Sequence, residues 1–310
     1  MKSVLVTGVN GFVGKHLTNA LIKSGHTVYG IGLQPEPHKL IASGLYKYFA
    51  VDLTDQSQVN RLPLAEIDGV INLAGLANVG ASFNDAKRYM TVNVAVVDNL
   101  ANAIRASGKK IRHLAISTGA VYDPSQKPPF VENSNLVAVS SPYVMSKIAM
   151  EERAANHRRS GEDIIIARPF NHIGPGQETG FLLPDLIFQV KQSIASNSPI
   201  MVGNLSTKRD YTDVRDVVQA YVSLLAAENL SHDTYNICSG KSIEGTKLLE
   251  LVINSLHPSS KPQVVVDPKK FRPSDAPDIY GSADKLRRDT GWQPTIALEQ
   301  TISDTLASSL

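Results

Sequence analysis

Cysteine is the residue that this sequence most nearly lacks, and its scarcity excludes two kinds of structural support. The chain has 310 residues and one cysteine, Cys238, so it can form no intrachain disulfide and no cluster of metal-binding thiolates. No two of its histidines have the spacing of a zinc site, and we predict no bound metal. Cysteine scarcity of this kind is typical of a reducing compartment, which predicts a cytoplasmic protein.

An excess of charge of one sign and a long apolar run are also missing. The chain has 31 Lys and Arg against 29 Asp and Glu, a net charge of +2, which gives no electrostatic basis for a nucleic-acid or membrane partner. A membrane-spanning helix needs about 20 consecutive apolar residues, whereas runs such as 164–167 are short. Residues 1–6 resemble the start of a signal peptide, but glycines follow where its apolar core would continue, which favours a buried first strand.

Short apolar runs alternate with amphipathic helical segments in the first half of the chain. A length of 310 residues predicts about two domains. The predicted strands are 4–7, 28–31, 48–51, 70–73, 114–117 and 164–167, and the predicted helices are 12–23, 85–106 and 142–159. This alternation predicts a doubly wound parallel α/β sheet of the Rossmann type, which binds ligands beyond the carboxyl ends of its strands.

The pattern changes after Arg168, where prolines and glycines become frequent. This change predicts a second, smaller lobe. Residues 235–238 have the composition of one more strand, so we expect the chain to return to the sheet. We therefore predict a dinucleotide-binding domain over 1–170, revisited around 212–240, and a C-terminal substrate-binding lobe over 171–211 and 241–310.

A glycine-rich loop joins the first predicted strand to the first predicted helix. Glycine lets a backbone turn tightly and approach a ligand closely, and a helix N-terminus offers N–H groups and partial positive charge to a phosphate. An ordinary turn is the alternative, but the position between strand and helix favours a dinucleotide pyrophosphate. The predicted contacts from this loop are Gly8, Asn10, Gly11, Phe12, Val13 and Gly14.

Tyr143 and Lys147 are four residues apart on a predicted helix and so share one face. Of the ten tyrosines, Tyr143 alone has a lysine at this spacing. An ammonium group near a phenol lowers the phenol's pKa from about 10, which would make Tyr143 a usable proton donor or acceptor. The alternative is a surface tyrosine beside a solvated lysine.

The spacing Gly-x-x-Gly-x-x-Gly, together with Tyr-x-x-x-Lys, resembles the extended short-chain dehydrogenase/reductase family. In its Ser/Thr segment, similar to 116–122 here, the hydroxyl four positions before the tyrosine (Tyr122) is catalytic. This implies a catalytic role for Thr118, with Ser117 as the competitor. The resemblance implies that cofactor contacts also come from Asp52, Leu53, Leu73, Ala74, Gly75, Asn93, Tyr143, Lys147 and Arg168. Asp52 has the alternative of a turn residue or helix cap, and Asn93 matches an asparagine that supports the fold and the active-site helix.

The end of the second predicted strand indicates which nicotinamide cofactor is used. An acid there accepts the adenosine ribose hydroxyls and favours NAD, whereas a nearby arginine favours NADP. Gly32 occupies this position and is followed by Leu33 and Gln34. With no acid to repel the extra phosphate, we expect NADP or NAD to be used, with a slight preference for NADPH.

Longer strings in the second half make the resemblance more specific. Residues 168–177 (RPFNHIGPGQ), 202–205, 209–217, 235–240, 272–275 and 290–294 are similar to the GDP-mannose 4,6-dehydratase and GDP-4-keto-6-deoxymannose reductase branch. This implies a GDP-sugar substrate, for whose diphosphate arginines are suitable donors. The implied substrate contacts are Ser82, Thr118, Asn171, Arg209, Arg272 and Asp275. For each arginine the alternative is a solvated charge or an internal ion pair.

Three reactions are open to this branch, and one residue helps to separate them. In the dehydratases a glutamate lies two residues after the catalytic threonine; here that position is Ala120, which cannot move a proton. The resemblance therefore favours NAD(P)H-dependent reduction of GDP-4-keto-6-deoxy-D-mannose to GDP-D-rhamnose. Reduction on the other face would give GDP-6-deoxy-D-talose.

Other readings stay open beside the reductase. A nucleotide-sugar 4-epimerase with tightly bound NAD uses the same Thr/Tyr/Lys set, and a dehydratase ranks lower. A cofactor-binding regulatory protein without turnover is a further alternative. The family also implies a homodimer formed through the predicted helices 85–106 and 142–159.

Overall fold

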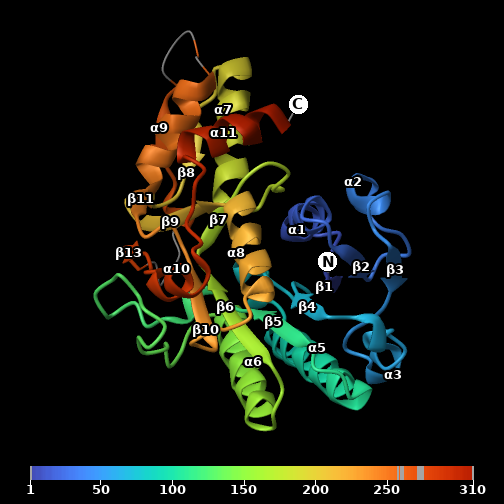
Figure 1. Ribbon diagram of the computed structural model, residues 1–310. Helices are drawn as coiled ribbons and strands as arrows, with labels where there is room; N and C mark the ends of the chain where they lie inside the picture. Colours follow the sequence, from blue (N-terminus) through green and yellow to red (C-terminus); the bar gives the residue numbers. More distant parts are fainter. Residues whose placement is uncertain (1, 257, 259–261, 271–275, 309–310) are drawn as a thin grey trace.

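A parallel sheet of seven strands forms the larger part of the molecule (Figure 1). The computed structural model describes residues 2–256, 258, 262–270 and 276–308. The strands follow the spatial order β10-β6-β5-β4-β1-β2-β3, and each neighbouring pair is parallel. Their bounds are β1 Ser3–Thr7, β2 Thr27–Gly32, β3 Lys47–Ala50, β4 Gly69–Asn72, β5 Arg112–Ile116, β6 Ile164–Pro169 and β10 Thr234–Ile237. This is the doubly wound Rossmann-type sheet predicted from the sequence.

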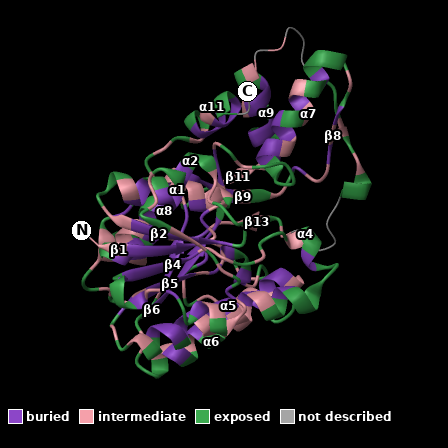
Figure 2. Cartoon of the chain, turned by 90° about the vertical axis from the view of Figure 1, so that its right-hand side faces the viewer, coloured by how far each residue is buried: buried purple, intermediate pink, exposed green. Residues whose placement is uncertain are grey.

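Helices cover both faces of this sheet (Figure 2). One face packs against α1 (Phe12–Lys23) and α8 (Val214–Ala226), and the other against α5 (Ala86–Ser107) and α6 (Pro142–Arg159). The smaller helical elements of this part are α2 (Lys39–Ala42), α3 (Gln56–Val59), α4 (Val79–Ser82), η1 (Leu64–Glu66) and η2 (Gly119–Val121). Since both faces are covered, the strands are apolar almost throughout, as a buried parallel sheet requires.

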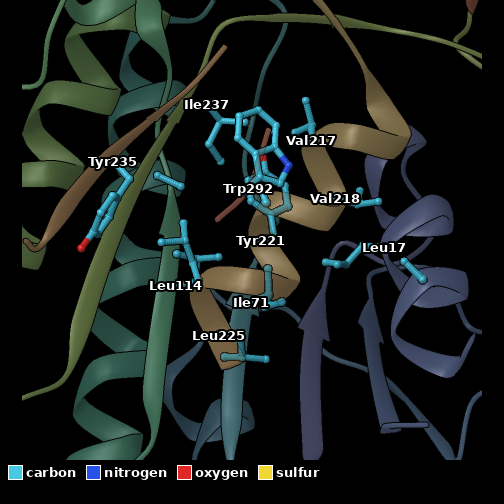
Figure 3. Close-up of a cluster of buried hydrophobic side chains, with 14 of the residues drawn as sticks. Leu17, Ile71, Leu114, Val217, Val218, Tyr221, Leu225, Tyr235, Ile237 and Trp292 are labelled. Carbon is cyan, nitrogen blue, oxygen red and sulfur yellow. The ribbon is translucent and has the colours of Figure 1, made fainter. Parts of the chain in front are cut away.

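Successive residues of each central strand supply opposite cores. Val4 and Val6 of β1 pack with α1 and α8, whereas Leu5 between them packs with α5. Figure 3 shows the first of these cores, in which Tyr221 of α8 and Trp292 are fully or almost fully buried beside Leu114 of β5. The sheet edge that carries the site is therefore held rigidly from both sides.

Local signals fix the ends of the two long helices. Asp85 caps α5 by accepting a hydrogen bond from the Arg88 N–H at 3.1 Å, and α5 ends at Gly108, whose φ of 67° suits glycine. Ser141 caps α6 in the same way, and Pro142 occupies its first turn, as the sequence predicted.

The second half of the chain builds a smaller, mixed assembly beside the large sheet. β9 (Lys208–Asp213) pairs with β7 (Asn171–Ile173), β11 (Ser242–Glu244) and β13 (Asp278–Ile279), and β8 (Ile200–Val202) pairs with β12 (Val264–Val266). Its helical elements are α7 (Leu182–Ser196), α9 (Gly245–Leu256), α11 (Leu298–Ser308) and η3 (Pro268–Lys270). Helix α10 (Asp284–Thr290) lies within the segment 241–310 that was predicted as part of the second lobe, but it packs against β10 and α8 of the large-sheet part. A separate apolar cluster unites α7, α9 and α11 with β8. Among the described residues, no helix is both long and apolar enough to cross a lipid bilayer.

Candidate active site

The carboxyl ends of β1, β4 and β5 meet at one edge of the large sheet, and most of the predicted site residues follow these ends. The segments concerned are 8–14 after β1, 73–75 after β4 and 117–118 after β5. A parallel sheet brings such segments together because all its strands point the same way.

The loop after β1 can only be built with glycine at two positions. Gly8 has a φ of +68°, and a Cβ there would lie 3.2 Å from the Ala74 nitrogen. A Cβ on Gly14 would lie 2.2 Å from the Gly8 carbonyl oxygen. Helix α1 begins directly after Gly11, with no side-chain cap and no acidic residue in its first turn. Its first N–H groups, at Phe12 and Val13, therefore suit an anion such as a pyrophosphate.

Asn10 holds the neighbouring loop with its side chain. Its Oδ1 accepts from the His38 N–H at 2.8 Å, and its Nδ2 lies 3.0 Å from Gln34 Oε1 and 3.3 Å from the Tyr48 hydroxyl. Tyr48 also limits the space at Gly32, at the end of β2, because a Cβ there would lie 2.5 Å from the Tyr48 oxygen. The end of β2 therefore presents amide and phenol groups where an NAD-specific site has an acid.

Asp52 and Leu53 lie after β3, close to the adjoining helix α3. The Asp52 carboxylate accepts from the Thr54 N–H at 2.9 Å and from the Thr54 hydroxyl at 2.7 Å, which is the turn role that the sequence left open. The Leu53 side chain is buried in the core, and its carbonyl accepts from Asn99. Any cofactor contact from Asp52 or Leu53 would therefore come from their backbone or from the second carboxylate oxygen of Asp52, Oδ2.

The segment Leu73-Ala74-Gly75 is fixed from two sides. Thr7 bonds to Asn72 at 2.6 Å and accepts from the Ala74 N–H at 2.9 Å. Gly75 has a φ of +153°, and a Cβ there would lie 2.7 Å from Asn93 Oδ1. Because Gly75 has no side chain, a flat ligand can lie directly against the backbone at this segment.

Asn93 joins that segment to the helix that carries the tyrosine. Its Oδ1 accepts from the Leu76 N–H at 2.8 Å, while its Nδ2 donates to the Leu76 carbonyl and to Ser146 Oγ. All of these partners are protein groups, and the side chain is 2% exposed. The contacts agree with the supporting role that the resemblance implied.

Tyr143 and Lys147 lie on the face of α6 that meets the end of β5. The Thr118 hydroxyl lies close enough to the Tyr143 phenol to lower the pKa of that phenol. Lys147 donates to the Ile116 carbonyl at 2.7 Å. Ser117 instead points inward, where its hydroxyl donates to Glu151. Of the two hydroxyls that the sequence offered, the geometry brings Thr118 to the tyrosine.

Burial has the largest effect on the pKa values of Tyr143 and Lys147, and it changes the pKa of Tyr143 in the direction opposite to the one that the sequence predicted. Burial raises the pKa of Tyr143 to about 12, and the Thr118 hydroxyl opposes this rise. Burial likewise lowers the pKa of Lys147 to about 8, against the attraction of Glu151. The net lowering of the phenol's pKa that the sequence predicted is therefore not found: burial raises this pKa more than Thr118 lowers it, and Lys147 donates to the Ile116 carbonyl. A protonated phenol beside a hydroxyl is suited to giving a proton.

Arg168 is held inside the protein and not at the sheet edge. It donates to both carboxylate oxygens of Glu151, at 2.9 and 2.5 Å, and to the Tyr122 hydroxyl at 3.0 Å. Its side chain is 7% exposed. The structure thus gives the Arg168 side chain the role of an internal ion-pair partner and does not bring it to the predicted cofactor position. The sequence analysis also missed Glu151, although it lies four residues beyond Lys147 on the same helix face.

The other predicted substrate residues, one on α4 and the rest in the second lobe, are less closely grouped. Asn171 is exposed on β7. Arg209 lies on the neighbouring β9, where it donates to the Lys208 and Ala276 carbonyls at 2.8 Å. Ser82 is fully buried and donates to the Val79 carbonyl at 2.6 Å, so its hydroxyl faces α4. Arg272 and Asp275 lie outside the described residues.

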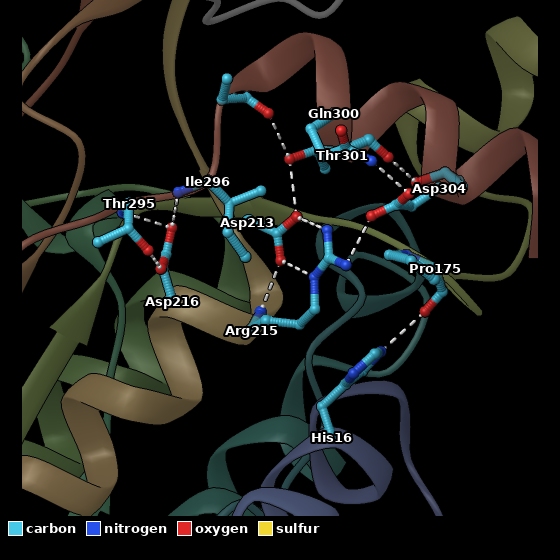
Figure 4. A network of polar contacts seen from close by, with 12 residues as sticks. His16, Pro175, Asp213, Arg215, Asp216, Thr295, Ile296, Gln300, Thr301 and Asp304 are labelled. Carbon is cyan, nitrogen blue, oxygen red and sulfur yellow. Dashed lines mark hydrogen bonds and ion pairs between the residues drawn. The ribbon is translucent and has the colours of Figure 1, made fainter.

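A second feature that the sequence did not reveal connects the glycine loop with the smaller lobe. The ring of Phe12, the first residue of α1, stacks on His172 with centroids 6.2 Å apart. His16, one turn later, donates from Nε2 to the Pro175 carbonyl at 2.8 Å (Figure 4). Helical spacing places Phe12 and His16 on one face, which is the signal that could have indicated the contact.

Comparison with known proteins gives one consistent relationship over nearly the whole chain. The family described as GDP-mannose 4,6 dehydratase matches residues 5–305. A GDP-6-deoxy-D-mannose reductase of Pseudomonas aeruginosa is 33% identical over 304 residues, which cover 96% of this chain and 94% of the relative.

Two solved structures share the fold over their full length. The structure of RMD from Pseudomonas aeruginosa complexed with NADPH has a TM-score of 0.82, 30% identity and complete coverage of both chains. A Thermus thermophilus UDP-glucose 4-epimerase in complex with NAD has a TM-score of 0.84 and 26% identity, and covers 99% of this chain and 98% of its own.

Proposed function

Because the chain belongs to the GDP-mannose 4,6 dehydratase family, an NAD(P)-dependent branch of the extended short-chain dehydrogenases and reductases, we propose that it reduces GDP-4-keto-6-deoxy-D-mannose to GDP-D-rhamnose. The observation that carries this proposal is the approach of the Thr118 hydroxyl to the Tyr143 phenol at the carboxyl edge of the sheet, with Ala120 in place of a dehydratase's glutamate. Loss of water from the sugar needs that additional acid or base, whereas reduction does not.

The proton chemistry falls to three side chains. Tyr143, whose phenol is protonated, gives its proton to the C4 oxygen of the keto sugar. Thr118 hydrogen-bonds the same oxygen and polarises the carbonyl. The ammonium of Lys147 then stabilises the phenolate that remains. A bound NAD(P)H supplies the hydride for C4, so the ketone becomes a secondary alcohol as the cofactor is oxidised.

The residues after β1 and β4 fit such a cofactor. The glycine cradle at Gly8, Gly14 and Gly75 leaves backbone exposed where a Cβ would collide, and the N-terminus of α1 suits the pyrophosphate. We propose that Gly11, Phe12 and Val13 contact it, together with 73–75. The polar cluster at Gly32 and Tyr48 contains no carboxylate side chain, which supports a preference for NADPH.

We propose that the sugar nucleotide lies against the second lobe. Asn171 and Arg209 lie on paired strands, and with Arg272 and Asp275 they supply donors for a diphosphate and an acceptor for a ribose hydroxyl. Ser82 contributes through the position of α4 near the hexose. The two-lobe division at residue 170, with a return at 212–240, is part of this proposal and is supported by the separate apolar cluster of α7, α9 and α11.

A homodimer in the cytoplasm completes the proposal. It is supported by the single, buried Cys238 and by the pair α5 and α6, which pack on each other along the outside of the sheet. Light scattering on the purified protein tests the dimer directly.

A nucleotide-sugar 4-epimerase is the second candidate, because the same Thr/Tyr/Lys set serves it and an epimerase shares the fold at 26% identity. One experiment separates the two: nicotinamide absorbance is followed during incubation with enzymatically made GDP-4-keto-6-deoxymannose and either NADPH or NADH. Consumption identifies a reductase, and NMR of the product distinguishes rhamnose from talose. No consumption, with NAD retained by the purified protein, identifies an epimerase and contradicts the reductase.

A further inference from the structure

The face of α6 that carries Tyr143 and Lys147 continues to a third polar residue, Glu151. The three are spaced at four-residue intervals and so lie one above another. Each faces a different residue at the end of β5: Tyr143 lies near Thr118, Lys147 donates to the Ile116 carbonyl, and Glu151 accepts from Ser117. The proton-transfer machinery proposed above uses the first two contacts and leaves the third without a role.

Glu151 is buried, and each of its oxygens has a partner. Its side chain is 6% exposed. Oε1 accepts from Ser117 and from Arg168 Nε, and Oε2 accepts from Arg168 Nη2. Three donors hold this carboxylate in one orientation.

Arg168 is fixed on its far side as well. It donates to the Tyr122 hydroxyl and the Glu132 carbonyl, and its guanidinium lies over the Tyr122 ring at 5.0 Å. Because Arg168 is locked in this way, Glu151 cannot rotate away from Ser117. A buried charge pair of this kind seldom adds net stability relative to apolar residues, so its presence beneath Lys147 calls for another explanation.

The charges around Lys147 give that explanation. Glu151 is the ionisable group that acts on Lys147, Tyr89 of α5 lies near Tyr143, and Arg168 of β6 is paired with Glu151 and Tyr122. Among them Glu151 is the one that favours the ammonium form of Lys147, while burial opposes that form. The cation of Arg168 is directed at Glu151 and Tyr122, away from Lys147.

We propose that Glu151 is a positioning residue for the reaction: its carboxylate keeps Lys147 in the ammonium form and, through Ser117, fixes the strand end that presents Thr118. The proposal rests on the proposed function for its catalytic meaning, but the control of Lys147 is a property of the protein alone. One buried carboxylate thereby sets both the charge and the geometry of the Tyr143 site.

The test measures the titration of Lys147 without any substrate. In protein labelled with [¹³C]lysine, the side-chain resonance of Lys147 is assigned by its disappearance in Lys147→Arg and is then followed with pH. We expect Glu151→Gln to move the midpoint to lower pH by about one unit, because the nearest negative charge is lost. An unchanged midpoint in Glu151→Gln overturns the proposal.

Asp98→Asn is the matched control. Asp98 of α5 pairs with Arg153 and hydrogen-bonds His157, both on α6, at 2.9 Å, so it fixes α6 to a neighbouring element without contacting Lys147 among the interactions above. Its loss therefore weakens helix packing without removing the charge near Lys147. A shift as large in Asp98→Asn as in Glu151→Gln would show that general loosening, and not the carboxylate, controls Lys147.

A double variant keeps the test decisive if Glu151→Gln fails to fold with Arg168 left unpaired. Glu151→Gln combined with Arg168→Gln removes both charges and preserves similar side-chain volumes. The Lys147 midpoint should still lie below that of the wild type, and equality with the wild type contradicts the proposal.

Turnover gives a second, separate readout. In Glu151→Gln we expect the decline of kcat on the alkaline side to begin at lower pH, with KM for the GDP-sugar little changed. If wild-type protein shows no turnover of the keto sugar, the proposed function is wrong, while the Lys147 titration still decides the role of Glu151.

Discussion

At the scale of single residues, burial decides which groups in the site hold a proton. Tyr143 is 8% exposed, and burial raises its pKa to about 12, so the phenol stays protonated through the physiological pH range. The same burial lowers the pKa of Lys147 to about 8. A neutral donor next to a cation is the arrangement that a carbonyl reduction needs, because the oxygen must gain a proton and the donor must then bear a negative charge.

Removal of the phenol hydroxyl tests this arrangement. Tyr143→Phe should lower kcat by about 10²- to 10⁴-fold, the usual contribution of a positioned proton donor, with the Kd for NADPH nearly unchanged. Stopped-flow absorbance and NADPH fluorescence measure the two quantities. Tyr29→Phe is the control, because Tyr29 is equally buried but its hydroxyl bonds to Glu66 at 2.8 Å, on β2 and away from the site. Full turnover in Tyr143→Phe contradicts the proposed role.

Gly32 at the end of β2 and Tyr48 on β3 allow the proposed preference for NADPH to be tested. Gly32→Asp alone should weaken both NADPH and NADH, because the new Cβ meets the Tyr48 oxygen at 2.5 Å. Gly32→Asp with Tyr48→Phe removes that oxygen and places a carboxylate beside the ribose, which should shift the ratio of the two Kd values toward NADH by about tenfold or more. Fluorescence titration gives both constants. Tyr48→Phe alone serves as the control, and a ratio in the double variant equal to that of this control contradicts the assignment.

Much of the candidate site could be predicted at the level of residue types, but the direction of each side chain could not. The sequence identified Thr118, Tyr143 and Lys147, and left Ser117 as a competitor. Only the fold shows that Ser117 points inward to Glu151, since adjacent residues at the end of a strand face opposite sides. Arg168 and Asn10 have donors that suit a ligand, yet those donors are occupied by partners remote in sequence, which no local pattern reveals.

At the scale of elements, periodicity gave the strands of the large sheet and the helices α1, α5 and α6 almost to the residue, whereas α7, α8, α9 and α11 were not predicted. The predicted helices 12–23 and 142–159 are α1 and α6, and the strand expected at 235–238 is β10. Caps explain this accuracy, because Ser141-Pro142 and Gly108 are signals within the sequence itself. The short strands β8, β11, β12 and β13 were not predicted, since two or three residues carry no measurable period.

The junction between β1 and α1 should tolerate no side chain at Gly14. Gly14→Ala places a Cβ 2.2 Å from the Gly8 carbonyl oxygen, a backbone atom that cannot move without opening the loop. We expect a loss of about 1–3 kcal/mol in stability and a loss of NADPH binding, measured by thermal unfolding and fluorescence titration. Asn19→Ala, at an exposed position of the same helix, should change neither quantity, and normal NADPH binding by Gly14→Ala would contradict the proposed cradle.

Strand β5 carries a histidine that should make stability depend on pH. His113 is 1% exposed, neither ring nitrogen has a hydrogen-bond partner among the described residues, and burial lowers its pKa from 6.5 to about 4. His113 therefore binds a proton with a pKa near 6.5 in the unfolded chain, but only with a pKa of about 4 in the folded protein. The stability due to neutral His113 is complete above pH 6.5 and is lost as the pH falls toward 4, by about 3 kcal/mol.

Comparison with an apolar variant isolates this effect. In urea unfolding at several pH values, His113→Leu should lose less stability between pH 6.5 and 4 than the wild type, because the titrating group is gone. At pH 7 the variant should be as stable as the wild type or more so, since two unsatisfied ring nitrogens are removed from the core. Parallel pH curves for the two proteins would contradict the assignment to His113.

At the scale of the whole molecule, the glycine loop and the first turns of α1 contact the second lobe directly. Arg215, at the start of α8, bonds to Asp213 at 2.7 Å and reaches Asp304 of α11 in the second lobe at 2.6 Å (Figure 4). Across to α1, the described contacts include the stack of Phe12 on His172 and the bond from His16 to the Pro175 carbonyl. A ligand that orders one side therefore restricts the other, which is the physical basis of coupled binding.

This link predicts that cofactor and nucleotide bind cooperatively and that His16 transmits part of the effect. In the wild type, saturating GDP should tighten NADPH binding by about fivefold, a coupling of about 1 kcal/mol. His16→Ala should reduce the coupling while leaving each separate affinity within about threefold, because the bond to Pro175 touches neither ligand site directly. His232→Ala, remote from both, is the control. Since burial lowers the pKa of His16 below 6.5, its ring is neutral at pH 7 and above, and the coupling should be the same from pH 7 to 9. Equal coupling in wild type and His16→Ala would show that the two lobes communicate by another route.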